Sequence, residues 1–119
     1  MREQHGQLVW TEIRAGDIEA AEARDEDISG LVEQVARSSG MRVGLLFNEQ
    51  RGGVKVSCRT SQWEPSVDAS ALMARFGGGG HVRAAGALIA GDLVDVRERV
   101  LDAARAALEA AKTRAPVSA

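Results

Sequence analysis

Two strand-like runs joined by a short, glycine-containing segment constrain the fold of this chain more than any other feature. The runs are MRVGLLF at 41–47 and GVKVSCRT at 53–60, and NEQRGG lies between them. Apolar runs rich in β-branched residues are typical of strands, and a connection of this length with glycines is typical of a hairpin. The sequence therefore predicts a β-hairpin over residues 41–60.

Further short apolar runs predict strands, and segments with caps and helical spacing predict helices. The additional strands are expected at 7–13 and 86–90. Helices are expected at 15–23, 25–40, 66–77 and 91–112. With 119 residues and 45% hydrophobic content, the chain can build one core. We therefore expect an α/β fold: a single layered domain in which helices cover a mixed sheet of about four to five strands.

Two of these helices place apolar side chains on one face. In the helix at 66–77 that face is formed by Val67, Ala71, Leu72 and Phe76. In the helix at 91–112 it is formed by Leu93, Val96, Val100, Ala104 and Leu108. Ser66 or Asp68 would cap the first helix and Gly77 would end it, while Asp92 would cap the second. The second helix either covers the sheet or serves as a docking face for a partner.

The single cysteine, Cys58, cannot form an internal disulfide, which fits a reducing compartment. The sequence has no run of about 18 apolar residues and no basic-then-apolar signal segment. We expect a cytoplasmic chain with no membrane partner. Cys58 stands beside Arg59 with no adjacent base, so a packed thiol is expected rather than a nucleophile.

Charge is unevenly distributed along the chain. Residues 1–34 carry nine acidic and three basic side chains, whereas residues 35–91 carry seven basic and three acidic ones. The basic side chains of the middle segment are Arg37, Arg42, Arg51, Lys55, Arg59, Arg75 and Arg83. They could attract an anion, or they could simply solvate an exposed face. Charge counting does not decide between these alternatives.

The segment RFGGGGHVRAAGA at 75–87 places four glycines directly before a histidine. A flexible linker would alternate Gly with Ser and separate independent units, whereas these glycines lie between a helix and a strand. Without side chains, their backbone N–H groups could converge on phosphate oxygens. His81 and Arg83 could then add hydrogen bonds and charge, although His81 could equally be a turn histidine bonded to a carbonyl. The small residues Ala84, Ala85 and Gly86 would let the backbone pass close under a neighbouring helix.

The stretch VKVSCRTSQWEPSVDASALMARFGGGGHVRAAGALI resembles the C-terminal, DHH-associated domain of the DHH phosphoesterase superfamily. In that family a strand ending in Ser-x-Arg-Ser leads through a Val-Asp-x-Ser helix to Gly-Gly-Gly-His-x-x-Ala-Ala-Gly. The resemblance extends back through GLVEQVARSSGMRVGLLFNEQ and assigns residues 1–119 to this domain. It is strongest to the branch of bifunctional oligoribonucleases and pAp phosphatases. Cyclic-dinucleotide phosphodiesterases and RecJ-like single-strand exonucleases are more distant alternatives.

The resemblance implies that this domain binds the substrate while a separate DHH domain performs catalysis. The substrate-binding residues it implies are Arg59, Gly78, Gly79, Gly80, His81 and, at a variable position of the motif, Arg83. Thr60 stands where Ser is usual and keeps the hydroxyl. Arg37 lies in a similar stretch, but no contact can be assigned to it. Short oligoribonucleotides or phosphorylated nucleotides are the implied ligands.

Residues for catalysis and metal binding are not found in the sequence. There is no Asp-His-His triplet, and the acidic DEDIS at 25–29 is better explained by a helix start. We therefore expect no catalytic residues, no metal ligands and no cofactor in this chain, and no hydrolysis by the chain alone. The resemblance implies a longer phosphoesterase whose other domain, the missing catalytic partner, holds two Mn²⁺. A homodimer formed through that parent protein, and an interaction or assembly role for the helix at 91–112, both stay open.

Overall fold

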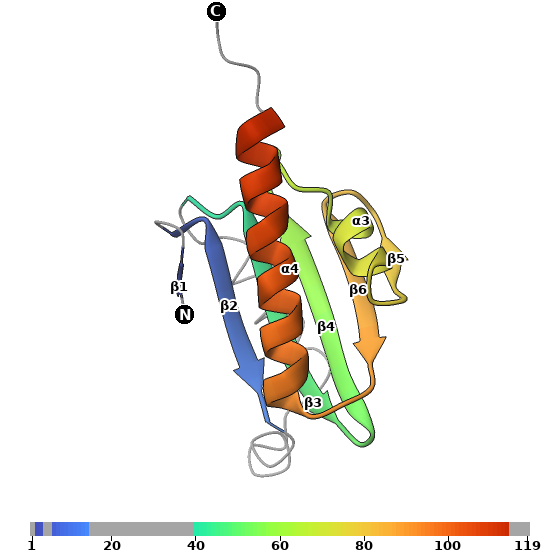
Figure 1. The fold of residues 1–119 in the computed structure, drawn as a ribbon. Helices are drawn as coiled ribbons and strands as arrows, with labels where there is room; N and C mark the ends of the chain where they lie inside the picture. Colours follow the sequence, from blue (N-terminus) through green and yellow to red (C-terminus); the bar gives the residue numbers. More distant parts are fainter. Residues whose placement is uncertain (1, 4–5, 15–39, 115–119) are drawn as a thin grey trace, which may run out of the picture.

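The computed structural model describes residues 2–3, 6–14 and 40–114. The helices expected at 15–23 and 25–40 fall outside these ranges, as do the DEDIS cluster and Arg37. The described residues form one mixed sheet with two helices (Figure 1), which confirms the α/β class and the single layered domain.

The sheet has six strands in the order β1-β2-β3-β4-β6-β5. Their bounds are β1 (Arg2–Glu3), β2 (Leu8–Ile13), β3 (Val43–Gln50), β4 (Gly53–Thr60), β5 (Gly79–Gly80) and β6 (Ala84–Ile89). Only β2 and β3 pair in parallel, and the other neighbours are antiparallel. The two-residue strands β1 and β5 are additions to the four strands that the sequence predicts. A pair of glycines gives no propensity signal for a strand, so β5 forms because of its pairing with β6.

The predicted hairpin is formed by β3 and β4, with a shorter connection than expected. The ladder continues through Asn48↔Lys55 to Gln50↔Gly53, so the turn consists of Arg51 and Gly52 alone. Gly52 has φ +83°, a conformation that glycine adopts without the steric penalty of a side chain. The remaining residues of NEQRGG therefore belong to strands.

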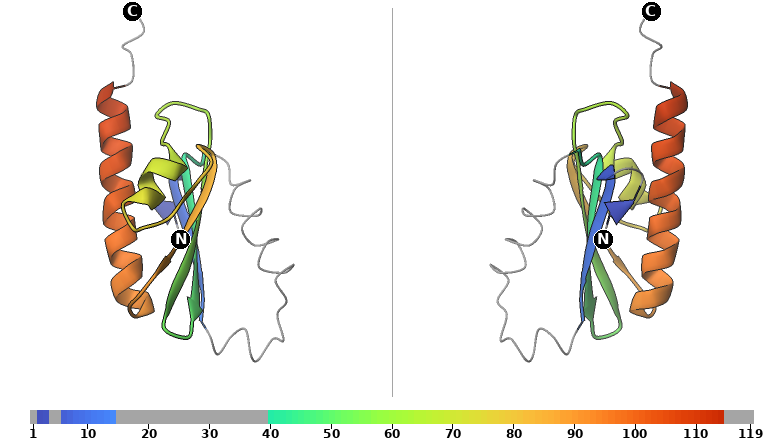
Figure 2. Two further views of the ribbon diagram at one scale, coloured as in Figure 1. Left: turned by 90° about the vertical axis from the view of Figure 1, so that its right-hand side faces the viewer. Right: turned by 90° about the vertical axis from the view of Figure 1, so that its left-hand side faces the viewer.

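Both described helices lie on one face of the sheet (Figure 2). They are α3 (Ala69–Ala74) and α4 (Leu93–Arg114), and α4 runs along β3 and β4. The sheet contributes Val43, Leu45, Phe47, Val54, Val56, Cys58, Ala85, Ala87 and Ile89 to the shared core. Neither helix of the described ranges is long and apolar enough to cross a membrane.

The buried face of α4 agrees with the apolar face predicted from the sequence, whereas that of α3 differs. All five residues predicted for the stripe of α4 are buried against the sheet, so this stripe covers the core and is not a free docking face. The helix at 66–77 is shorter than predicted because Asp68 caps it, accepting from the Ala71 N–H at 3.0 Å. Starting the helix at Ala69 turns Ala69, Leu72 and Met73 inward. The prediction that Ala71 lies on the apolar face was wrong, because that residue is exposed.

A polar and aromatic cluster fastens α4 to the sheet near β2. Arg97 Nη1 donates to Glu12 Oε2 at 2.7 Å, and the guanidinium carbon lies 5.6 Å from the centre of the Trp10 ring. Trp10 in turn packs edge-on against Phe47, with ring centroids 6.2 Å apart. The hydrogen bond to Glu12 raises the pKa of Arg97, so the cation is favoured in the folded state. This cluster joins residues distant in sequence and links α4 to β2 through Arg97.

We predict that Arg97→Ala lowers the free energy of unfolding by about 2 kcal/mol, because a charge-assisted hydrogen bond and a cation–π contact are both lost. Arg99→Ala serves as the matched control: Arg99 forms an exposed pair with Asp95 on the same helix. Such pairs contribute roughly 0–0.5 kcal/mol. Urea unfolding followed by circular dichroism measures both, and equal effects of the two substitutions would contradict the role given to Arg97.

Candidate functional site

Three of the six predicted substrate residues, Arg59, Gly79 and His81, lie on the sheet face opposite to the helices. Alternation along β4 turns Val56, Cys58 and Thr60 toward the core, where all three are buried. Ser57 and Arg59, between them in sequence, therefore point to the other face and are half-buried. Arg59 Nη1 donates to the Cys58 carbonyl at 3.3 Å. The strand thus presents a guanidinium on a face that α3 and α4 do not cover.

Strand register brings Arg59 and His81 into one row across the sheet. Arg59 is the partner of Ala84 in the β4–β6 ladder. The His81 N–H donates to the Ala84 carbonyl at 2.7 Å, and the Ala84 N–H donates back to the His81 carbonyl at 3.2 Å. Directly paired antiparallel residues project to the same face, and neighbouring strands are about 4.8 Å apart. The backbones of Arg59 and His81 are therefore about 10 Å apart on one face, and Ala84 is the described residue between them.

The next row on this face has almost no side chains. Ser57 pairs with Gly86, and Gly86 pairs with Gly79. Together with Ala84 of the first row, Gly79 and Gly86 form a surface of very small residues, which we call the glycine floor. Sequence reasoning had included Gly79 but had assigned Gly86 only a packing role and had not considered Ser57. The alternation of Ser57 with Arg59 in the predicted strand is the signal that could have identified the serine.

Three of the four consecutive glycines are required by the fold itself. Gly77 has φ +82°, and Gly80 has φ +149° with the Ala84 carbonyl oxygen 2.7 Å from where a Cβ would lie. At Gly78 a Cβ would be 2.1 Å from the Gly86 carbonyl oxygen. Gly79 differs, because its φ is not in the positive region and a Cβ there would meet nothing within 4 Å. Steric demands within the described fold do not explain why residue 79 lacks a side chain.

Most backbone N–H groups of this run are used within the protein. Gly77 donates to Ala74, Gly78 to Met73, and His81 to Ala84. The expected row of free, converging amides is therefore not formed. Because the His81–Ala84 pair is hydrogen-bonded, alternation turns the N–H and C=O of Gly80 away from β6, toward the outer edge of the sheet. Gly80 is the position of this run that offers its backbone outward.

Arg83, the remaining predicted site residue, is directed inward. Its Nη1 donates to Thr60 Oγ1 at 3.2 Å and to the Ser61 carbonyl, and its Nη2 donates to Ser66 Oγ at 3.0 Å. These bonds tie the β5–β6 turn to the loop between β4 and α3. The Thr60 hydroxyl also donates to the Val82 carbonyl at 2.9 Å. The structure thus groups Arg59, His81 and the glycine floor on one face, and gives Arg83 internal partners beneath the turn.

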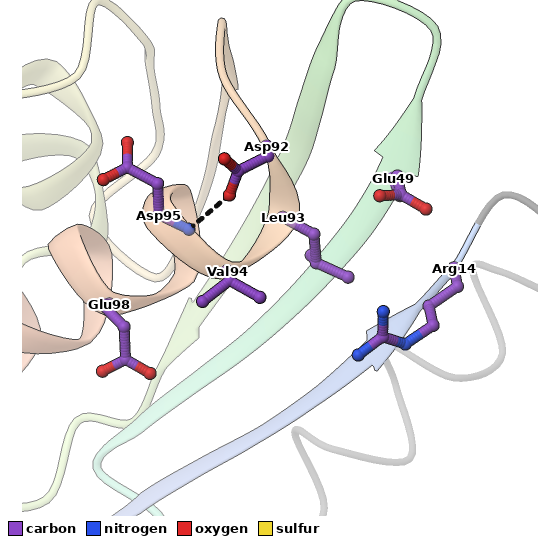
Figure 3. A pocket seen from close by; sticks show the side chains of 7 residues that line it. All are labelled: Arg14, Glu49, Asp92, Leu93, Val94, Asp95 and Glu98. Atoms are coloured by element: carbon purple, nitrogen blue, oxygen red, sulfur yellow. Dashed lines mark hydrogen bonds between the residues drawn. The ribbon is translucent and has the colours of Figure 1, made fainter.

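Cys58 and the acidic residues at the start of α4 do not belong to this face. Burial raises the pKa of the Cys58 thiol to about 12, so the thiol is protonated at neutral pH and is a poor nucleophile. A separate cavity of about 620 Å³ is lined by Arg14, Glu49, Asp92, Leu93, Val94, Asp95 and Glu98 (Figure 3). Its carboxylates would repel a phosphate, and Asp92 already caps α4 through the Asp95 N–H at 2.8 Å. Within the described ranges, no three His, Cys, Asp or Glu side chains gather as metal ligands.

Comparison with known proteins assigns this architecture to a family of domains. The DHHA1 domain model matches residues 8–111, so the chain belongs to the DHHA1 domain family of DHH phosphoesterases. The chain is 41% identical over 86 residues to the bifunctional oligoribonuclease and PAP phosphatase NrnA of Thermus thermophilus. That match covers 71% of this chain and 25% of the relative, so the chain spans about a quarter of the protein it resembles.

Solved structures show the same fold. An exopolyphosphatase-related protein from Bacteroides fragilis aligns with a TM-score of 0.68 and 21% identity, over 87% of this chain and 29% of that one. The pGpG-specific phosphodiesterase PggH from Vibrio cholerae aligns with a TM-score of 0.52 and 18% identity, over 83% and 33% respectively. At these identities the similarity concerns the fold of the domain.

We predict opposite outcomes for two adjacent glycine substitutions. Gly78→Ala should lower the free energy of unfolding by about 1–3 kcal/mol, because its Cβ overlaps the backbone of β6. Gly79→Ala should leave stability unchanged or raise it slightly, because the site is open and alanine restricts the unfolded chain. Thermal unfolding of the two variants makes the comparison. A destabilised Gly79→Ala variant would contradict the assignment of residue 79 to a surface free of internal constraint.

Proposed function

We propose that this chain binds short RNA or a phosphorylated nucleotide, as the substrate-binding domain of a metal-dependent DHH phosphoesterase. The observation that supports this most is the row in which Arg59 and His81 lie on either side of Ala84, at the glycine floor. A phosphate carries negative charge and several acceptor oxygens, and a guanidinium can donate two parallel hydrogen bonds to it. Membership of the DHHA1 family supports the same proposal.

Each group on this face has a distinct task in the proposal. Arg59 supplies the permanent charge and binds a phosphate of the ligand. The ring N–H of the exposed His81 donates from the other side of the floor. Gly79 and Gly86 leave room for a ribose or phosphate to approach the backbone closely, which a larger side chain would prevent. The outward-facing N–H of Gly80 adds a neutral donor at the sheet edge.

Hydrolysis, in this proposal, is carried out by another domain of the parent protein. The relative in Thermus thermophilus is named as an oligoribonuclease and PAP phosphatase, and we propose the same reaction class for the parent of this chain. Two Mn²⁺ in the DHH domain would activate water there, in a cytoplasmic enzyme that could pair as a homodimer. The role proposed for this chain itself is to bind and orient the ligand.

Binding by the separate domain should be weak. Two or three charge-assisted hydrogen bonds at about 1.5–3 kcal/mol each barely exceed the free energy lost when a ligand is immobilised. We therefore expect dissociation constants from high micromolar to millimolar, roughly −5 to −4 kcal/mol.

We predict that Arg59→Ala weakens binding of a pentaribonucleotide and of pAp about tenfold, and that His81→Ala weakens both about threefold, because each removes a donor to phosphate. Ligand-observed phosphorus NMR titration of the folded chain gives the dissociation constants. Arg99→Ala is the matched control, since it removes the same charge from α4, on the opposite face of the sheet.

Two outcomes would contradict the proposal. In the first, the Arg59→Ala variant binds both ligands as the wild type does. In the second, Arg99→Ala weakens binding as much as Arg59→Ala, which would mean that only net charge matters.

A further inference from the structure

A second cavity lies on the same sheet face as Arg59, nearer the start of β4, where Lys55 is one of its lining residues. Its volume is about 490 Å³, and its lining residues are Gln50, Lys55, Gly78, Gly86, Ala87 and Leu88. Gly86 also belongs to the glycine floor, so the cavity and the floor are continuous. Neither Gln50, Lys55 nor Leu88 is part of the site described above. The cavity therefore extends that site toward the β3–β4 turn.

Strand register places a cation and an apolar side chain at this end of the floor. Lys55 and Leu88 are partners in the β4–β6 ladder, two residues beyond the Ser57–Gly86 pair, and so project to the same face as Arg59. Both are exposed, and Leu88 keeps 70% of its surface accessible. Leu88 on β6 and Lys55 on β4 thus place an apolar and a cationic side chain next to each other along the cavity. Gln50 adds an amide with both donors and an acceptor.

We infer that Lys55, Leu88 and Gln50 form a second nucleotide subsite, which binds an oligonucleotide strand that runs along β4 from Arg59. This inference rests on the proposed function. Lys55 would bind a phosphate, Leu88 would contact the face of a base, and the Gln50 amide would donate to or accept from the base edge. Among the described residues, the surface between the two subsites consists of Ser57 and the glycine floor, whose side chains are small or missing.

The separation of the two cations determines which ligands can use both. Arg59 and Lys55 are four residues apart, about 13 Å along a strand. A stacked nucleic-acid strand rises about 3.4 Å per nucleotide, so about four stacked nucleotides span that distance. A mononucleotide such as pAp reaches only the Arg59 end. The second subsite therefore favours oligonucleotides over mononucleotides.

The test compares Lys55→Ala with Lys112→Ala, which removes the same charge from the far end of α4. Penta-adenylate and pAp are titrated separately into the folded chain at several salt concentrations. Lys55→Ala should weaken binding of penta-adenylate about three- to fivefold, as loss of one exposed charge pair implies, and should leave pAp binding unchanged. It should also reduce the slope of log K against log salt by about 0.7, the value for one phosphate contact to a single strand.

A second variant, Leu88→Ser, examines the apolar wall of the subsite without changing charge. It should weaken penta-adenylate binding and leave the salt slope as in the wild type. Lys112→Ala should leave the binding of both ligands unchanged.

The two proposals fail in distinguishable ways. If Lys55→Ala and Leu88→Ser leave penta-adenylate binding unchanged while Arg59→Ala still weakens both ligands, the second subsite is wrong and the proposed function stands. Equal effects of Lys55→Ala on penta-adenylate and pAp would also overturn the second subsite. If Arg59→Ala changes binding of neither ligand, the proposed function itself fails.

Discussion

The hydrogen bonds of Arg83 join the β5–β6 turn, which carries the candidate-site residue His81, to the end of β4, which carries Arg59, and to the loop that leads to α3. Its guanidinium lies between the end of β4 and the loop that leads to α3, and donates to Thr60, Ser61 and Ser66. The same region is joined by backbone bonds: Thr60 N–H donates to the Arg83 carbonyl, and Ala69 N–H donates to that of Val82. Because Arg59 immediately precedes Thr60 and His81 lies two residues before Arg83, these bonds fix the row in which Arg59 and His81 stand.

Close backbone contact is the second condition for this arrangement. Gly78 passes so near β6 that a Cβ would overlap the Gly86 carbonyl, and this contact allows β5 to pair at the sheet edge. Within the described residues, the opposite surface of this part of the sheet carries few side chains, because Gly79 and Gly86 lie on it. The close pairing of β5 and β6 requires glycine at positions 78 and 80, on either side of Gly79. Among the four consecutive glycines, Gly79 is the one that the described fold does not require to be glycine. We therefore attribute the lack of a side chain at this position to ligand binding.

Much of this fold could be predicted from the sequence, because its main elements have strong local signals. The hairpin, the capped helix α4 and its apolar stripe follow from periodicity and turn residues. The strand β5 could not be predicted, because glycine has low strand propensity and the pairing is decided by tertiary contacts. The inward face of α3 was misassigned at Ala71 for a related reason: tertiary packing turns Ala69, Leu72 and Met73 inward, although Asp68 was one of the two caps predicted. The two helices predicted within residues 15–40 fall outside the described ranges, so they stay predictions.

The candidate site was predictable in its parts but not in its geometry. Motif resemblance pointed to Arg59, the glycines and His81, and could not show that Arg83 has internal partners or that most glycine amides are used within the fold. Cross-strand register, which no local pattern specifies, brings Ser57, Gly86 and Gly79 into one row and extends the face to Lys55. The dependence of the site on register is therefore its least predictable and most informative property.

The most direct test of this account is to map where a short oligoribonucleotide binds, by following the amide and arginine Nε signals of the folded, isotope-labelled chain. The account predicts that the largest shifts occur at Arg59, at Gly79 and Gly80, and at His81, with little change along α4. Shifts concentrated on α4 or around Asp92 and Asp95, with the glycine floor unaffected, would contradict it.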